Sequence, residues 1–217
     1  MTHPITLKEA LASGAEKLRS YGIESPTVVA ELLLIHVLKC KRVDLYLNLN
    51  QELSISQIAH FDTLLTQRIE GKPVQYLTNL ANFFGFELYV DQNVLIPRPE
   101  TEILVEAVLK KLSGTGKRLK IIDWGTGSGN IAIALAAHLD GEIYAVDISE
   151  KALKVAEKNV LTHGLEHKIN LLPGDGFSTM PKNLRREMDA VVSNPPYVKI
   201  AEMNSLPKEV RDFEPKE

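Results

Sequence analysis

The sequence predicts an α/β protein in which a parallel, doubly wound sheet follows a small helical bundle. Two observations carry this prediction. From Leu119 onward, apolar runs of strand length alternate with amphipathic runs of helix length, which is typical of βαβ units. Before Lys72 the apolar residues recur at helical spacing instead. We therefore expect a helical bundle over residues 1–72, a β-hairpin linker over 73–97, and a sheet domain over 98–217.

Capping signals predict the helices of the N-terminal bundle. Thr6 with Glu9, and Ser54 with Gln57, have the spacing of a capping box, in which two side chains satisfy free backbone N–H groups at a helix start. The Ser25-Pro26 pair is expected to be an N-cap followed by the first helical residue. The apolar stripes of these helices are most simply a core, and we expect no chemistry from this bundle.

The linker changes to a period of two. Residues 84–90 alternate like a strand, residues 91–93 have turn chemistry, and the apolar run 94–96 is expected to pair back as a hairpin. Pro99 then opens a predicted helix through Leu112.

The sheet domain is expected to place its ligand at the carboxyl ends of its strands. The predicted strands are 119–123, 142–147, 169–172 and 189–193, and the helices between them are 129–139 and 149–163.

A glycine-rich loop follows the first of these strands. In Asp123-Trp124-Gly125-Thr126-Gly127-Ser128-Gly129, three glycines alternate with other residues and lead into a helix, whose N-terminal N–H groups are free to bind a ligand. Asp147 closes the next strand, where an acid can accept hydrogen bonds from ribose hydroxyls. The segment from Gly127 to Ala132 also fits the relaxed dinucleotide pattern, so a nicotinamide dehydrogenase stays an alternative on this motif alone.

The segment Asn194-Pro195-Pro196-Tyr197 ends the last predicted strand. Two prolines hold it rigid and remove two backbone donors. The Asn194 side-chain oxygen and the Pro195 carbonyl then form a pair of acceptors beside the Tyr197 ring, which suits a planar –NH2 group. An ordinary proline-rich turn is the competing interpretation.

Asp175 follows the third strand and could accept a hydrogen bond from an adenine amino group, although a solvated turn acid is an equally good interpretation.

Composition bounds the remaining possibilities. The chain has 217 residues and a net charge of −3, which gives no overall basic field for nucleic acid. It has no apolar run long enough for a membrane span, no signal-peptide pattern and a single cysteine, Cys40, so we expect a cytoplasmic monomer. His36 lies four residues before Cys40 without further ligands nearby, so we expect a packed pair and no metal site.

Three segments together resemble the HemK/PrmC family, whose members methylate the glutamine of the Gly-Gly-Gln motif in peptide chain release factors. They are residues 94–102 (Val-Leu-Ile-Pro-Arg-Pro-Glu-Thr-Glu), the glycine loop with Asp123, and 192–197. The glycine loop is similar to the S-adenosylmethionine loop of class I methyltransferases, which have a Rossmann-like fold. The resemblance covers nearly all of the chain and implies a helical substrate-docking domain before a methyltransferase domain.

The resemblance also implies roles for residues by position. The cofactor S-adenosylmethionine, converted to S-adenosylhomocysteine, is expected to contact Gly125, Thr126, Gly127, Ser128, Gly129, Asp147, Asp175, Gly176 and Asn194. The substrate glutamine is expected to bind Asn194, Pro195, Pro196 and Tyr197, of which Asn194, Pro195 and Tyr197 would act in catalysis. Relatives carry an aromatic residue against adenine where this chain has Gly176, and Phe177 could replace it. Glu100 is a candidate base by resemblance only.

Family members continue beyond the equivalent of Glu217, so we expect a C-terminally truncated chain that lacks the last strands of its sheet. A DNA or RNA amino-methyltransferase would use the same acceptor motif, and a catalytically inactive binding module is a further alternative. The acidic balance and the helical N-terminal domain argue against nucleic acid. We expect release factors as partners, with no membrane and no direct nucleic-acid binding.

Overall fold

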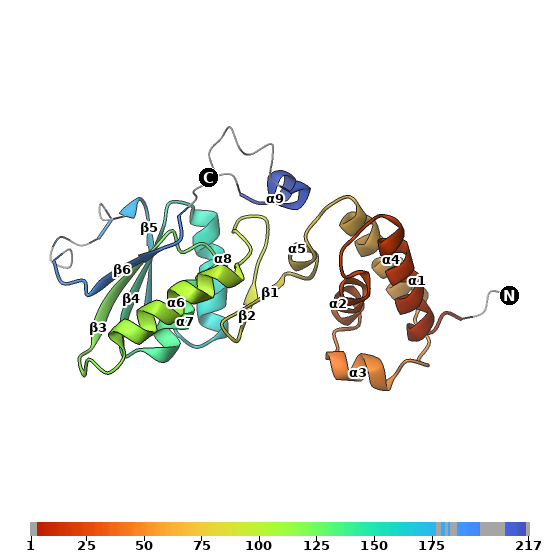
Figure 1. Ribbon diagram of the computed structural model, residues 1–217, viewed down its shortest axis with the longest axis horizontal. Helices are drawn as coiled ribbons and strands as arrows, with labels where there is room; N and C mark the ends of the chain where they lie inside the picture. Colours follow the sequence, from red (N-terminus) through yellow and green to blue (C-terminus); the bar gives the residue numbers. More distant parts are fainter. Residues whose placement is uncertain (1–3, 177–178, 181, 183–185, 196–206, 216–217) are drawn as a thin grey trace. The chain divides into compact units, whose positions relative to one another are not determined.

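The computed structural model describes most of the chain as two compact units (Figure 1). The described residues are 4–176, 179–180, 182, 186–195 and 207–215. The first unit holds Met1–Thr78 with Pro207–Phe213, and the second holds Asn79–Leu206 with Glu214–Glu217. Within the described residues, no helix is both long and apolar enough to cross a membrane.

The first unit is helical throughout. Its helices are α1 (Leu7–Ser20), α2 (Pro26–Leu38), α3 (Arg42–Leu47), α4 (Ile55–Ile69), α5 (Val74–Thr78) and α9 (Lys208–Phe213). The apolar stripes of α1, α2 and α4 meet in one buried cluster, which includes Leu18, Leu33 and Leu65. This burial, rather than helix propensity, supplies most of the stability of such short helices.

All three predicted helix starts of the bundle are confirmed. The Thr6 and Ser54 side chains accept hydrogen bonds from the backbone N–H groups three residues later. In return, the side chains of Glu9 and Gln57 accept from the backbone N–H groups of Thr6 and Ser54. The structure also has Ser25 as the N-cap of α2 and Pro26 as its first residue, as predicted. The φ of Ser25 is 48°, in the left-handed region, and its side chain makes no capping hydrogen bond.

Near the C-terminus, residues 208–213 form α9 within the helical unit. Arg68, which is buried, makes an ion pair with Glu209. A Cβ atom at Gly71 would meet the side chains of Lys208 and Phe213 at 3.2–3.4 Å. Helix α9 is only six residues long, and its ion pair with Arg68 joins residues 141 positions apart in the sequence.

The linker is a hairpin, but in a different register from the predicted one. Strands β1 (Leu80–Phe83) and β2 (Phe86–Tyr89) pair antiparallel around Phe84 and Gly85, which have φ values of 51° and 82°. These positive values belong to a tight turn that glycine favours. The predicted return strand 94–96 is absent, and its residues Val94 and Ile96 are buried outside any ladder.

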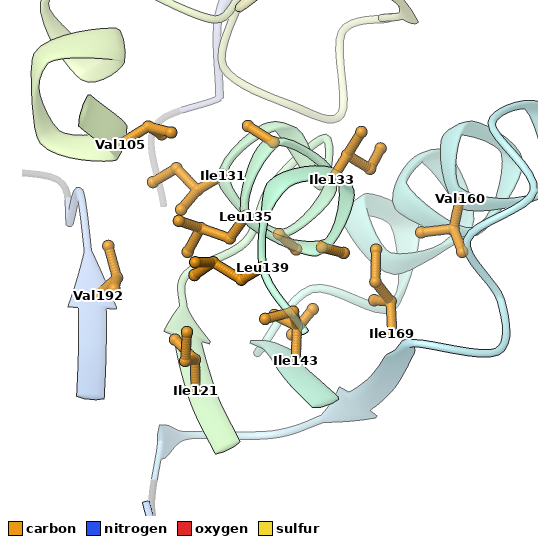
Figure 2. Close-up of a cluster of buried hydrophobic side chains, with 14 of the residues drawn as sticks. Val105, Ile121, Ile131, Ile133, Leu135, Leu139, Ile143, Val160, Ile169 and Val192 are labelled. Carbon is orange, nitrogen blue, oxygen red and sulfur yellow. The ribbon is translucent and has the colours of Figure 1, made fainter. Parts of the chain in front are cut away.

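The second unit contains a parallel sheet in the order β5-β4-β3-β6. Its strands are β3 (Leu119–Trp124), β4 (Gly141–Asp147), β5 (Ile169–Pro173) and β6 (Ala190–Ser193), and its helices are α6 (Pro99–Leu112), α7 (Asn130–His138) and α8 (Glu150–Thr162). Figure 2 shows Ile121, Ile143 and Val192 from the sheet packed against Leu135 on α7. The predicted parallel α/β architecture is confirmed, and it brings the carboxyl ends of β3, β4 and β6 together at one edge.

Candidate active site

The glycine loop has an open backbone. Gly125, Gly127 and Gly129 have φ values of 75°, 54° and 80°, which non-glycine residues rarely adopt. No described atom lies within 4 Å of the place where a Cβ would stand at Gly125 or Gly127. Gly129 caps α7 and packs against Ala156, so its smallness serves helix packing instead. The loop therefore leaves room for a ligand over its first two glycines.

Asp147 is tied to this loop. Its Oδ2 accepts from the Gly127 N–H at 2.8 Å, and its Oδ1 accepts from the Ser149 N–H at 2.9 Å. Each carboxylate oxygen keeps a further lone pair for a ribose hydroxyl. The next residue, Ile148, is 72% exposed. An exposed apolar side chain next to Asp147 can pack against a planar group, and sequence reasoning did not single it out because it looks like an ordinary strand-end residue.

Asp123 lies fully buried beneath the loop. Its Oδ2 accepts from the Thr126 hydroxyl at 2.6 Å and from the Ala132 N–H at 3.1 Å. Burial raises the pKa of Asp123 from 3.8 to about 7, although both hydrogen bonds act to lower it. Two buried atoms of this segment, Asp123 Oδ1 and Ser128 Oγ, have no hydrogen-bond partner among the described residues. Such atoms are rare in folded proteins and mark a place where a ligand or water can bind.

Asn159 on α8 connects the loop to the hairpin, and sequence reasoning missed it. Its Oδ1 accepts from the Tyr89 N–H at 2.7 Å, and its Nδ2 donates to the carbonyls of Tyr89 and Ser128, both at 2.9 Å. Asn159 is 1% exposed, and its bond to the Ser128 carbonyl is buried, whereas its two bonds to Tyr89 are partly buried. Asn159 thus holds β2 and the glycine loop in fixed register.

Asn194 follows the end of β6, and its neighbour Ser193 donates to the Trp124 carbonyl at 2.8 Å. The Asn194 side chain is half-buried, and its Nδ2 donates to the hydroxyl of Thr101 on α6 at 3.0 Å. Pro195 is exposed. The predicted site residues Pro196 and Tyr197 lie outside the described residues.

Asp175 and Gly176 follow β5. Asp175 is exposed, as either interpretation of its role allows. A Cβ atom at Gly176 would lie 2.2 Å from the Trp124 ring, so the indole fills the volume of a side chain at position 176. Phe177, the predicted replacement for an aromatic residue here, lies outside the described residues. Glu100 is exposed in the first turn of α6, which favours a role at the helix start.

The sequence of the chain is similar to that of known protein families and of individual known proteins. The PrmC N-terminal domain family matches residues 9–78, and the methyltransferase small domain family matches residues 99–208. The release factor glutamine methyltransferase of Chlorobaculum tepidum is 40% identical over 216 residues, which are 97% of this chain and 72% of that protein. That of Koribacter versatilis is 40% identical over 212 residues, covering 97% and 74%.

The chain belongs to the release factor glutamine methyltransferase family. A third relative, from Flavobacterium psychrophilum, is 44% identical over 179 residues, which are 81% of this chain and 61% of that protein. The chain is thus an S-adenosylmethionine-dependent methyltransferase with the predicted fold class, and the dehydrogenase alternative is set aside.

The residues of the glycine loop fit this cofactor. Open space over Gly125 and Gly127 admits a ligand close to the backbone. The unpaired Asp123 Oδ1 suits the cationic amino group of a methionine moiety, either directly or through water. Asp147 suits the ribose hydroxyls. A pyrophosphate would instead require cationic or free N–H donors, and the acid beneath this loop argues against one.

Proposed function

We propose that this methyltransferase transfers a methyl group to the side-chain amide nitrogen of the glutamine in the Gly-Gly-Gln motif of peptide chain release factors. The names of its relatives support release factors as the substrate. The observation that carries the proposal is the Asn194 amide, whose Nδ2 is engaged by Thr101 at the sheet edge that also holds the glycine loop. This arrangement leaves Asn194 Oδ1 as the acceptor for a substrate group.

The chemistry demands such acceptors, because an amide nitrogen is a poor nucleophile whose lone pair is delocalised into the carbonyl. In the proposed mechanism, Asn194 Oδ1 and the Pro195 carbonyl each accept one N–H of the substrate amide. Holding both N–H bonds aims the nitrogen and favours its pyramidalisation as the new bond forms. When bound, S-adenosylmethionine would supply a methyl group on its sulfonium sulfur. The S–CH3 bond breaks as the N–CH3 bond forms, S-adenosylhomocysteine is the leaving group, and the amide nitrogen gives up one of its two protons to water. Tyr197 is proposed to pack against the amide plane.

The decisive experiment compares acceptors. Labelled S-adenosylmethionine is incubated with the chain and either a purified release factor, the same factor with its motif glutamine changed to asparagine, or duplex DNA. We expect label in the unaltered release factor only. Methylated DNA, or label in the asparagine variant at an equal rate, would contradict the proposed acceptor. Asn194→Ala should lower the rate on the order of 10²–10³ while S-adenosylhomocysteine still binds.

We also propose that the helical unit docks the release factor. The short helix α3 exposes three large apolar side chains: Val43 is 59% exposed, Tyr46 47% and Leu47 76%. The hydroxyl of Tyr46 donates a hydrogen bond to the buried carboxylate of Glu31, which also forms an ion pair with Arg42. This contact holds α3 on α2, so the apolar side chains are presented on a supported surface. A large protein substrate needs such a second contact, because one glutamine side chain buries little area.

A further inference from the structure

The start of α6 carries the segment Pro97-Arg98-Pro99-Glu100-Thr101, of which the function proposed above uses only the contact between Thr101 and Asn194. Pro99 opens the helix and Arg98 is its N-cap, without a side-chain capping bond. The Arg98 and Thr101 side chains are therefore not used by the helix start itself. Thr101 is nevertheless only 5% exposed.

Thr101 binds the Asn194 amide. Its Oγ1 accepts from Asn194 Nδ2 at 3.0 Å, across 93 positions of sequence. The angle about the last bond of an asparagine side chain is soft, so a free amide would sample many orientations. A hydrogen bond to a buried hydroxyl on a helix of 14 residues restricts that rotation. The remaining amide oxygen then has a defined position.

Arg98 binds the chain on the other side of the acceptor motif. Its Nη2 donates to both carboxylate oxygens of Glu214, at 2.5 and 2.7 Å. The Glu214 side chain is 2% exposed, and that of Arg98 is 35% exposed. Because a buried carboxylate is costly without its cation, this pair holds Glu214 firmly to the start of α6.

We propose that Arg98 and Thr101 are positioning residues for methyl transfer. Thr101 fixes the Asn194 amide, and Arg98 fixes the chain 20 residues later, at Glu214. The start of α6 thus holds the first residue of the acceptor motif and a second point of the chain 20 residues beyond it. The proposal rests on the function proposed above, in which Asn194 receives the substrate amide. Neither residue touches the glycine loop in the described hydrogen bonds, so both should act on turnover and not on cofactor affinity.

Thr101→Val tests the first contact, because it keeps the volume of the side chain and removes the acceptor. With a purified release factor and saturating S-adenosylmethionine, we expect kcat to fall about 10-fold to 100-fold, as for a small misplacement of a reacting group. Calorimetry should give an unchanged dissociation constant for S-adenosylhomocysteine. Thr101→Ser restores the hydroxyl and should recover kcat to within about threefold of the unaltered chain. Thr162→Val, at an exposed threonine of α8, is the matched control.

A measurement independent of turnover accompanies these rates. The side-chain amide resonance of Asn194 in ¹⁵N NMR spectra should shift in Thr101→Val and stay in place in Thr101→Ser and Thr162→Val. Glu214→Gln, which keeps shape and removes the charge, should raise KM for the release factor without changing affinity for S-adenosylhomocysteine.

Unaltered kcat and an unaltered Asn194 resonance in Thr101→Val would overturn the proposal, and so would a loss of S-adenosylhomocysteine affinity that accounts for the lower rate. Asn194→Ala separates this failure from that of the proposed function. If Asn194→Ala is inactive and Thr101→Val is fully active, only the positioning role is wrong. If Asn194→Ala is fully active, the proposed acceptor role of Asn194 is wrong as well.

Discussion

Asp123→Asn should change how the stability of this protein depends on pH. Asp123 is fully buried, and burial raises its pKa from 3.8 to about 7. Asparagine has nearly the same shape and is neutral at every pH. The substitution therefore removes one titrating group from the folded state while keeping an oxygen that can accept from Thr126 and Ala132.

The direction of the pH dependence follows from whether the folded or the unfolded state holds the proton of Asp123. Between pH 4 and pH 7 the folded chain keeps Asp123 protonated, whereas the unfolded chain has released that proton. The contribution of Asp123 to the free energy of unfolding is therefore fully present below pH 4, falls as the pH rises to 7, and is level above 7. The rise in pKa to about 7 corresponds to a loss of about 4 kcal/mol over this range. Because Asp123 is buried, solvent does not screen this effect.

Urea unfolding followed by circular dichroism, at several pH values from 4.5 to 8, measures the difference directly. The free energy of unfolding of the unaltered chain, minus that of Asp123→Asn, should decrease as the pH rises and then level off near 7. Subtracting the variant cancels the histidines and surface carboxylates, which titrate in both proteins. Equal pH dependence in the two chains would show that Asp123 is ionised in the folded state and would refute the reasoning.

Three further predictions concern the cofactor loop and the docking surface. Asp147→Ala should weaken S-adenosylhomocysteine binding by about 2–4 kcal/mol in calorimetry, because charged hydrogen bonds to ribose are lost; unchanged affinity would contradict the ribose assignment. Asn159→Leu removes three buried hydrogen bonds and should lower both the thermal midpoint and S-adenosylhomocysteine affinity, whereas a variant that lost stability alone would reduce Asn159 to a structural residue. Val43→Ser with Leu47→Ser should raise KM for the release factor and leave cofactor affinity unchanged in steady-state kinetics and calorimetry, and an unaltered KM would remove α3 from the docking surface.

The sequence predicted those features that depend on residues close together in the chain. The parallel sheet could be predicted because each strand is a short apolar run that ends at a glycine, an acid or a proline, and each helix has its own period. The glycine loop could be predicted because positive φ values demand glycine at Gly125 and Gly127. The capping box of Thr6 succeeded for the same reason, since all its partners lie within three residues.

Errors arose where two local signals competed. Gly85 lies inside an alternating apolar run, and the alternation was preferred over the glycine as a turn signal. In the structure the turn forms at Phe84 and Gly85, where the Glu102 carboxylate accepts from the Phe84 N–H at 2.7 Å. That contact from α6 stabilises a phenylalanine in a left-handed conformation, which no local pattern would favour.

Several contacts that organise the candidate site are distant in sequence. Asn159 is 70 positions from Tyr89, Thr101 is 93 from Asn194, and Arg98 is 116 from Glu214. Sequence reasoning recognised the segments that hold Ser128, Asn194, Arg98 and Thr101, but it did not predict which residues they would contact. A motif names the groups that meet the ligands, but the residues that aim them have no fixed spacing from it, because any element that the fold brings near can supply the hydroxyl or the amide. Such residues become visible only once the fold is known, and the Thr101 and Asn159 variants test whether they matter as much to turnover and cofactor binding as the motifs they support.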